Sequence, residues 1–297
     1  MENTYHYPVM YREVIEQLAL VDKKVVVDCT VGMGTHSHKL LEAMPRDGRL
    51  VGIDKDEESL NIARVKLEDF KGRFNLIKSN FAQIKDVLAS LQLKSVDAFL
   101  FDLGISTYQL NNPERGFSFL REGPLDMRMD REAYLSAADL VETLSESELS
   151  DIFYKFGEER YARKIAAAVV AGRKRQPITT TTALAQVVSG SVPARMRHMR
   201  IHPATRIFQA LRIAVNRELD VIEDALRTAV SLLNKNGRIA VISFHSLEDR
   251  IVKHTFRDLC AKGQLELAVK KPLVPGEEEL RENNASRSAK LRVAIKL

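Results

Sequence analysis

Residues 25–37 read VVVDCTVGMGTHS, and this stretch decides the fold. Three consecutive valines predict a strand buried on both faces, and Asp28 follows at its carboxyl end. Gly32 and Gly34 permit a sharp turn before a helix that we expect to begin near His36. A strand, an acid, a glycine turn and a helix start together predict a cradle in which main-chain N–H groups face a small ligand.

A second acid points to a nucleoside as that ligand. Residues 49–54, RLVGID, predict another strand, and it ends in Asp54, where a Rossmann-type unit places the residue that holds ribose hydroxyls. Dinucleotide folds favour a third glycine where this chain has Ser37, and an acid ending the first strand suits the ammonium group of S-adenosylmethionine. We favour a methyltransferase; a dinucleotide enzyme and a turn without a ligand stay open.

The first third of the chain alternates between strands and helices. Further strands are expected at residues 74–78 and 96–102, which predicts an α/β fold with a parallel sheet and helices on both faces. Ligands in such sheets bind at the carboxyl ends of the strands, where Phe81 and Asp102 follow. Phe81 could stack on an adenine or cap the core, and the sequence favours neither.

The fifth strand is delayed until residues 238–244, RIAVISF. A crossover needs only a dozen or more residues, so we expect an insertion after the fourth strand. We expect residues 1–109 to form the first part of the α/β domain, 110–203 an inserted helical domain, and 204–297 the second part. A single helix is expected from about residue 202 to residue 233.

Basic residues gather in the inserted segment and the helix that follows it. The chain has 45 Lys+Arg against 40 Asp+Glu, a net charge of +5, which agrees with a polyanionic partner. Solvated helix faces are also charged, but three clusters in one segment favour phosphate contact. The candidate RNA-binding residues are Arg173, Lys174, Arg175, Arg197, Arg200, Arg206 and Arg212.

The rest of the composition is ordinary for a globular protein. Of the 297 residues, 45% are hydrophobic and 29% charged. The two cysteines, Cys29 and Cys260, lie far apart and suggest neither a disulfide framework nor a metal site. The N-terminus has no signal-peptide pattern and no stretch approaches a membrane span, so we expect a cytoplasmic protein without a membrane partner.

Several long strings resemble one family. They are DCTVGMGTHS, IDKD, DLGIS with Gln109, ERGFSF, GPLDMRMD, GEERYARKIA, HPATRIFQALRIAVN and SFHSLEDRIVK. Together they identify the chain as similar to the bacterial 16S ribosomal RNA cytosine-N4 methyltransferase family (RsmH, also called MraW). The resemblance implies a class I (Rossmann-like) S-adenosylmethionine methyltransferase sheet with an inserted helical domain, and it makes residues 110–203 an inserted helical RNA-recognition domain between the two parts of the methyltransferase domain, 1–109 and 204–297. It also implies N4-methylation of the P-site cytidine of 16S ribosomal RNA, with the small ribosomal subunit as partner.

Site residues follow from the resemblance and from the strand-end pattern. The pattern places Asp28 and Gly32 at the cofactor, and the resemblance adds Gly34, Thr35, His36, Asp54, Phe81, Asp102 and Gln109. Asp102 is the candidate catalytic residue, expected to orient either the target amine or the cofactor ammonium. A ribosome-assembly factor without activity and a nicotinamide oxidoreductase stay open as alternatives, and so does a homodimer.

Overall fold

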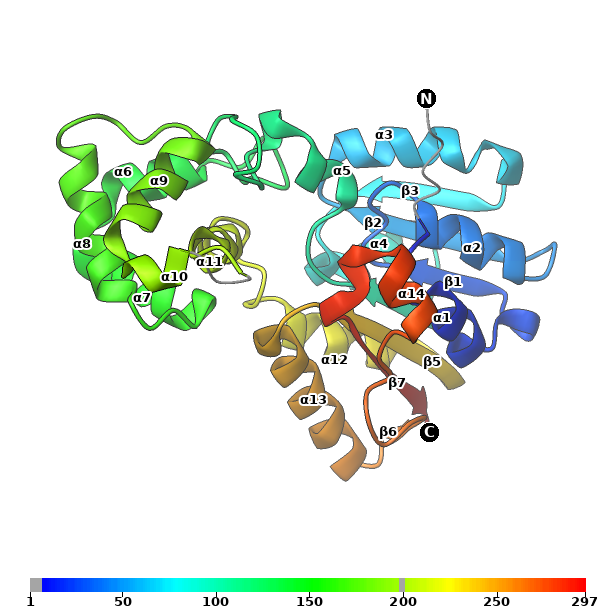
Figure 1. The fold of residues 1–297 in the computed structure, drawn as a ribbon. Helices are drawn as coiled ribbons and strands as arrows, with labels where there is room; N and C mark the ends of the chain where they lie inside the picture. Colours follow the sequence, from blue (N-terminus) through cyan, green and yellow to red (C-terminus); the bar gives the residue numbers. More distant parts are fainter. Residues whose placement is uncertain (1–6, 198–200) are drawn as a thin grey trace. The chain divides into compact units, whose positions relative to one another are not determined.

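The computed structural model describes residues 7–197 and 201–297, and it divides into two compact units. The first unit combines Met1–Gly104 with Leu219–Leu297, and the second comprises Ile105–Glu218 (Figure 1). Because the second unit enters and leaves between the fourth and fifth strands of the first, it is an insertion. The two units are described separately below.

One mixed sheet forms the centre of the first unit. Its strand order is β3-β2-β1-β4-β5-β7-β6, with the first five strands parallel and β7 antiparallel to both β5 and β6. The strands are β1 (Val25–Asp28), β2 (Arg49–Asp54), β3 (Phe74–Lys78), β4 (Val96–Asp102), β5 (Leu233–Ser243), β6 (Leu265–Leu267) and β7 (Lys290–Lys296). The parallel order reverses beside β1, so the carboxyl ends of β1 and β4 flank the switch point at which such sheets bind ligands.

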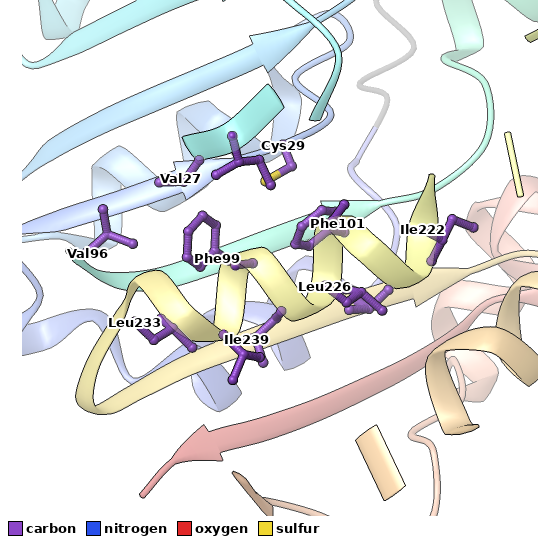
Figure 2. Close-up of a cluster of buried hydrophobic side chains, with 14 of the residues drawn as sticks. Val27, Cys29, Val96, Phe99, Phe101, Ile222, Leu226, Leu233 and Ile239 are labelled. Carbon is purple, nitrogen blue, oxygen red and sulfur yellow. The ribbon is translucent and has the colours of Figure 1, made fainter. Parts of the chain in front are cut away.

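Helices cover both faces of this sheet, as the alternating sequence predicts. On one face Val27, Phe99 and Ile239 pack with side chains of α4, α12 and α13, and Figure 2 shows Ile222 and Leu226 of α12 in this layer. Side chains of α1 and α2 pack on the other face. The α-helices are α1 (Tyr11–Leu18), α2 (Thr35–Ala43), α3 (Glu57–Lys66), α4 (Ile84–Ser90), α12 (Ile222–Leu232), α13 (Ser246–Ala261) and α14 (Glu277–Glu282). Short 3-10 turns are η1 (Leu20–Asp22), η2 (Glu68–Phe70), η3 (Phe81–Gln83) and η5 (Asn284–Ser288).

The second unit is helical and has a hydrophobic core of its own. Ser136 and Ser145 form capping boxes at the starts of α6 and α7. The core includes Phe153, Ile165 and Leu184, all without exposed surface. The helices are α5 (Thr107–Asn111), α6 (Ala137–Thr143), α7 (Glu146–Gly157), α8 (Ala162–Arg173), α9 (Thr181–Ser191), α10 (Ala194–Arg197) and α11 (Ala204–Asn216), with the 3-10 turn η4 (Pro113–Arg115).

The single helix expected over residues 202–233 is wrong. The first helix, α11, ends at Arg217, which has a left-handed backbone with φ of 49°. A second helix, α12, begins at Ile222. Ile207 and Leu211 of α11 pack in the core of the second unit, whereas Leu226 of α12 packs against the sheet. The second unit therefore runs to Glu218 and includes α11, whereas the sequence places its end at residue 203.

Within the described residues, no helix is both long enough and apolar enough to span a membrane.

Candidate active site

The turn after β1 lies across the ends of three strands. The Cys29 N–H donates to the Leu100 carbonyl at 2.9 Å, and the Val31 N–H donates to the Ile53 carbonyl at 3.1 Å. Gly34 has φ of +77°, and a Cβ added there would lie 3.0 Å from Ala63 Cβ of α3. Glycine is needed at this position both for the backbone conformation and for the close approach of α3. The turn is therefore fixed against β2, β4 and α3 before α2 begins.

Asp28 accepts hydrogen bonds from both ends of this turn. It has no exposed surface, and its carboxylate accepts the Thr30 N–H at 3.2 Å and the Ser37 hydroxyl at 2.6 Å. Burial raises the pKa of Asp28, and the Ser37 hydrogen bond offsets part of that rise. The direct cofactor contact expected of Asp28 is not available in this structure, because the turn encloses the carboxylate. Its role here is to fasten the turn to the start of α2.

Asp54 joins the same turn from the end of β2. Its carboxylate accepts the Gly32 N–H at 2.7 Å and the Asp56 N–H at 2.9 Å. Burial raises the pKa of Asp54 to about 6, although these two hydrogen bonds favour the ionised form. The residue is partly exposed, and each carboxylate oxygen can accept a second hydrogen bond. Asp54 can therefore accept hydroxyl groups from a ligand seated on the turn.

Asp102 ends β4 and faces the start of α2. Its backbone N–H donates to Thr30 Oγ1 at 2.6 Å, and its Oδ2 lies 3.2 Å from His36 Nδ1. Its Oδ1 is buried and has no hydrogen-bond partner among the described residues. A buried acceptor without a donor is costly, so its position favours a donor supplied by a ligand. Asp28, Asp54 and Asp102 are thus linked through one turn, as the strand-end pattern predicts.

Two further candidates have different surroundings. Phe81 opens η3 after β3 and is half buried, with its ring edge-on to Phe101 at a centroid distance of 5.7 Å. Gln109 is buried in α5 of the second unit, where its side chain accepts the Ser106 N–H at 3.0 Å in a capping box. The Phe81 ring caps the core and is also partly accessible, so both interpretations of it stay open.

The candidate RNA-binding residues divide into exposed and internal ones. Lys174 and Arg175 are exposed after α8, whereas Arg173 donates to the Val141 carbonyl. Arg212 forms a two-pronged ion pair with Glu218 at 2.9 Å, and both side chains are largely buried. Arg206 is half exposed but donates to the Glu158 carbonyl at 3.1 Å.

The polar face of α11 makes hydrogen bonds within the second unit. Gln209 donates to the Phe156 carbonyl at 3.0 Å, and Asn216 donates to the Met127 carbonyl at 2.7 Å. Arg197 belongs to α10, and Arg200 lies outside the described residues.

Two contributors to the site were not predicted from the sequence. Thr30 supplies the oxygen that accepts the Asp102 N–H, and Ser37 supplies the hydroxyl bound to Asp28. For Ser37 the available signal was a hydroxyl residue where a dinucleotide fold has glycine. For Thr30 the sequence offers no signal, because its partner lies 72 positions away.

The fold and the site together define a protein class. The sheet order, the glycine turn after β1 and the acid at the end of β2 fit S-adenosylmethionine. Asp102 Oδ1 is left to accept a donor from the cofactor or from the target of methylation. The chain is a class I S-adenosylmethionine-dependent methyltransferase. Comparison with protein families narrows this further: the model of the MraW methylase family matches residues 3–297, and the chain belongs to that family.

Relatives match the chain from end to end. A protein named ribosomal RNA small subunit methyltransferase H from Persephonella marina is 51% identical over 292 residues, covering 98% of this chain and 99% of the relative. Proteins of the same name from a Sulfurihydrogenibium species and from Brevibacillus brevis are 49% and 43% identical. The alignments cover 98% and 99% of this chain, and 99% and 98% of those relatives.

Proposed function

We propose that this chain methylates 16S ribosomal RNA at the exocyclic N4 amine of the P-site cytidine, with S-adenosylmethionine as the methyl donor. The names of the relatives support a small-subunit ribosomal RNA substrate. The family that the sequence motifs resemble supports the cytidine and its N4 position. The site contributes a chemical argument of its own, which rests on Asp102.

The proposal depends on Asp102 Oδ1, which has no hydrogen-bond partner among the described residues. A cytosine N4 amine is a weak nucleophile, because its lone pair is delocalised into the ring. S-adenosylmethionine, when bound, supplies an electrophilic methyl group on a sulfonium. Asp102 Oδ1, buried and without a donor, accepts an N–H of the amine, which directs the nitrogen lone pair and stabilises the positive charge that develops on the nitrogen. The proton that the nitrogen then loses requires only a weak base.

Other residues of the first unit would hold the cofactor. The first turn of α2 presents the main-chain N–H groups of Thr35 and His36, since Gly34 has no side chain to cap them. Asp54 would accept the ribose hydroxyls and Phe81 would lie beside the adenine. Gln109, which belongs to the second unit, is assigned to the methionine end by family resemblance alone. These assignments are proposals, and each can be tested by the affinity for S-adenosylhomocysteine.

RNA would meet the second unit through its exposed cations. Lys174 and Arg175 are exposed, as are Arg163 and Lys164 near the start of α8. Phosphate contact by such residues is independent of base sequence and fixes only the register of the RNA. We therefore propose that these residues bind the ribosomal RNA backbone, and that the assembled small subunit is the substrate.

The test maps the methylated nucleotide. Unmodified small subunits and naked 16S RNA are incubated with the protein and labelled S-adenosylmethionine, and the RNA is digested and analysed by mass spectrometry. One methyl group on N4 of the P-site cytidine, in subunits and not in naked RNA, is the expected result. Label at another nucleotide would overturn the assignment. Absence of label with intact cofactor binding would favour an assembly factor without activity.

A pair of variants tests the role of Asp102. Asp102→Asn keeps the shape of the side chain but removes its charge, and should lower the transfer rate at least about a hundredfold, in the range seen when one oriented electrostatic contact is lost. Asp86→Asn changes an exposed acid on α4 by the same atoms and should leave the rate unchanged. Near-normal transfer by Asp102→Asn would refute the role.

A further inference from the structure

His36 is clamped between two hydrogen-bond acceptors. Its Nε2 lies 2.9 Å from the Val9 carbonyl, its Nδ1 lies 3.2 Å from Asp102 Oδ2, and the residue is only 5% exposed. A neutral imidazole carries one N–H and one lone pair, so it can satisfy only one of these acceptors. Both contacts are favourable together when both nitrogens carry protons. The geometry therefore favours an imidazolium.

The surrounding charges agree with that protonation state. Burial by itself lowers the pKa of His36, but the nearby Asp102 and Asp28 carboxylates and the Val9 carbonyl outweigh it, so the pKa is raised. Glu279 of α14 is a third acid whose charge interacts with His36. A buried cation surrounded by acids is the arrangement in which an ionised histidine persists near neutral pH.

The segment around Val9, which contacts Nε2 of the His36 ring, is also held in place. Met10, next to Val9, donates its N–H to Glu279 at 2.7 Å and has a left-handed backbone with φ of 53°. Asn283 donates to the Tyr7 carbonyl at 3.2 Å. Residues from the other end of the chain thus fix the segment that carries the Val9 carbonyl. The imidazole is consequently fixed at both nitrogens and cannot turn away from Asp102.

We infer that His36 is a positioning residue whose positive charge, 3.2 Å from Asp102 Oδ2, orients that carboxylate so that Oδ1 is left to accept the target amine. The importance of the His36–Asp102 pair for methyl transfer rests on the function proposed above. The contact between the two side chains is a feature of the structure and does not depend on that function. A charged partner on one oxygen fixes the carboxylate plane, because the hydrogen bond is directional and buried. His36 then acts on the reaction through Asp102, without touching the base.

The first test is spectroscopic and needs neither cofactor nor RNA. The ring nitrogens of His36 are followed by ¹⁵N NMR in the free, full-length protein as pH is raised, with the His36 signals assigned by their loss in His36→Gln. Both nitrogens should be protonated at pH 7, and Asp102→Asn should lower the pKa of His36 by about one unit or more, a tenfold shift in its protonation equilibrium. A neutral ring at pH 7, or a pKa that Asp102→Asn does not move, would overturn the inference.

The second test separates the two ends of the ring. An asparagine amide can replace Nδ1, and a glutamine amide can replace Nε2. His36→Gln keeps the Val9 contact and loses the partner of Asp102, so its transfer rate should fall roughly tenfold or more, while His36→Asn should retain more of the rate. His38→Gln, on the same helix beside Glu42 and Phe70, is the matched control and should behave as wild type.

The effect of His36 on methyl transfer should depend on pH and on the presence of Asp102. In the wild type the rate should fall on the alkaline side as His36 loses its proton, and this fall should be absent in His36→Asn. The cost of His36→Gln should vanish when Asp102 is already asparagine, because the effect is transmitted through that residue. Equal costs in both backgrounds would show that His36 is merely structural. Near-normal transfer by Asp102→Asn would refute the role proposed for Asp102 in the reaction, and the NMR titration would still test whether His36 is ionised beside it.

Discussion

Thr30 Oγ1 accepts the backbone N–H of Asp102 at 2.6 Å, joining two residues that lie 72 positions apart. The contact connects the turn after β1 to the end of β4, where backbone pairing between these strands stops at Asp28 and Leu100. The hydroxyl therefore continues the connection between the strands by one further hydrogen bond. It fixes the main chain of Asp102 while His36 fixes its side chain.

Replacing Thr30 should disturb Asp102 without opening the core. Thr30→Val keeps the shape and leaves the Asp102 N–H without its acceptor, at a cost of about 1 to 3 kcal/mol if no water replaces it. We expect a slower methyl transfer and a modest fall in the free energy of unfolding, measured by urea denaturation. Thr30→Ser retains the oxygen and should restore both. A valine variant as active as the wild type would show that the bond is dispensable.

Ser37→Ala should destabilise the protein more at high pH than at low pH. The buried carboxylate of Asp28 has a raised pKa, and losing the Ser37 hydroxyl raises it further. A group whose pKa is raised by folding disfavours the folded state as pH rises through that pKa. Removal of one donor should cost about 1 to 3 kcal/mol, with the larger loss at pH 8 than at pH 5.

Urea unfolding at the two pH values measures this difference. Ser90→Ala serves as control, because Ser90 lies exposed at the end of α4 and donates to a backbone carbonyl rather than to an acid. Its effect should be small and independent of pH. A Ser37→Ala cost that does not change with pH would mean that Asp28 stays in one protonation state throughout.

The parallel strands β1 to β5 could be predicted from the sequence, because each combines an apolar run with a turn signal. Asp54 and Asp102 could be placed at one edge for the same reason: parallel strands present their carboxyl ends together. What the sequence cannot supply is the direction of each side chain once it is there. Asp28 ends its strand as the other acids do, yet it is enclosed, because the Ser37 hydroxyl in the first turn of α2, nine residues later, donates a hydrogen bond to it.

The end of the inserted unit was misplaced for a related reason. Residues 202–233 are helical in pattern almost throughout, and periodicity does not reveal that the apolar faces of α11 and α12 belong to different cores. The left-handed Arg217 between them carries no glycine or proline signal. Likewise, Arg212 looks like a phosphate ligand until its partner Glu218 is seen beside it.

Binding of S-adenosylhomocysteine should weaken as pH falls through about 6. Burial raises the pKa of Asp54 to about 6, so the carboxylate that would accept ribose hydroxyls is mostly ionised at pH 7 and mostly protonated at pH 5. If only the ionised form binds, the dissociation constant should rise about tenfold for each pH unit below that value. Calorimetric titrations from pH 7.5 to pH 5 measure it.

Asp54→Asn provides the comparison for that titration. The amide cannot ionise, so its affinity should be lower at pH 7 and nearly constant down to pH 5. Any pH dependence that remains in the variant belongs to another titratable group, such as buried Asp28, whose charge interacts with Asp54. A wild-type affinity that is flat across pH 6 would contradict the assignment of Asp54 to the ribose.

Exposure should decide which arginines and lysines of the second unit contact RNA. Lys174 and Arg175 are exposed and free to reach phosphates, whereas Arg212 is committed to Glu218. The double variant Lys174→Ala, Arg175→Ala should weaken binding to 16S RNA and lower the slope of log affinity against log salt concentration by about 0.7 to 0.9 for each lost contact. Filter binding at several salt concentrations gives the slope.

Lys85→Ala, in α4 of the first unit, is the matched control. It removes an exposed positive charge far along the chain from the segment that carries Lys174 and Arg175. It should alter neither affinity nor slope. Equal effects of both changes would mean that RNA responds to net charge alone, and no effect of the double variant would exclude this segment from the interface. A changed affinity at an unchanged slope would indicate altered folding rather than lost phosphate contacts, since counterion release scales with the number of phosphates neutralised.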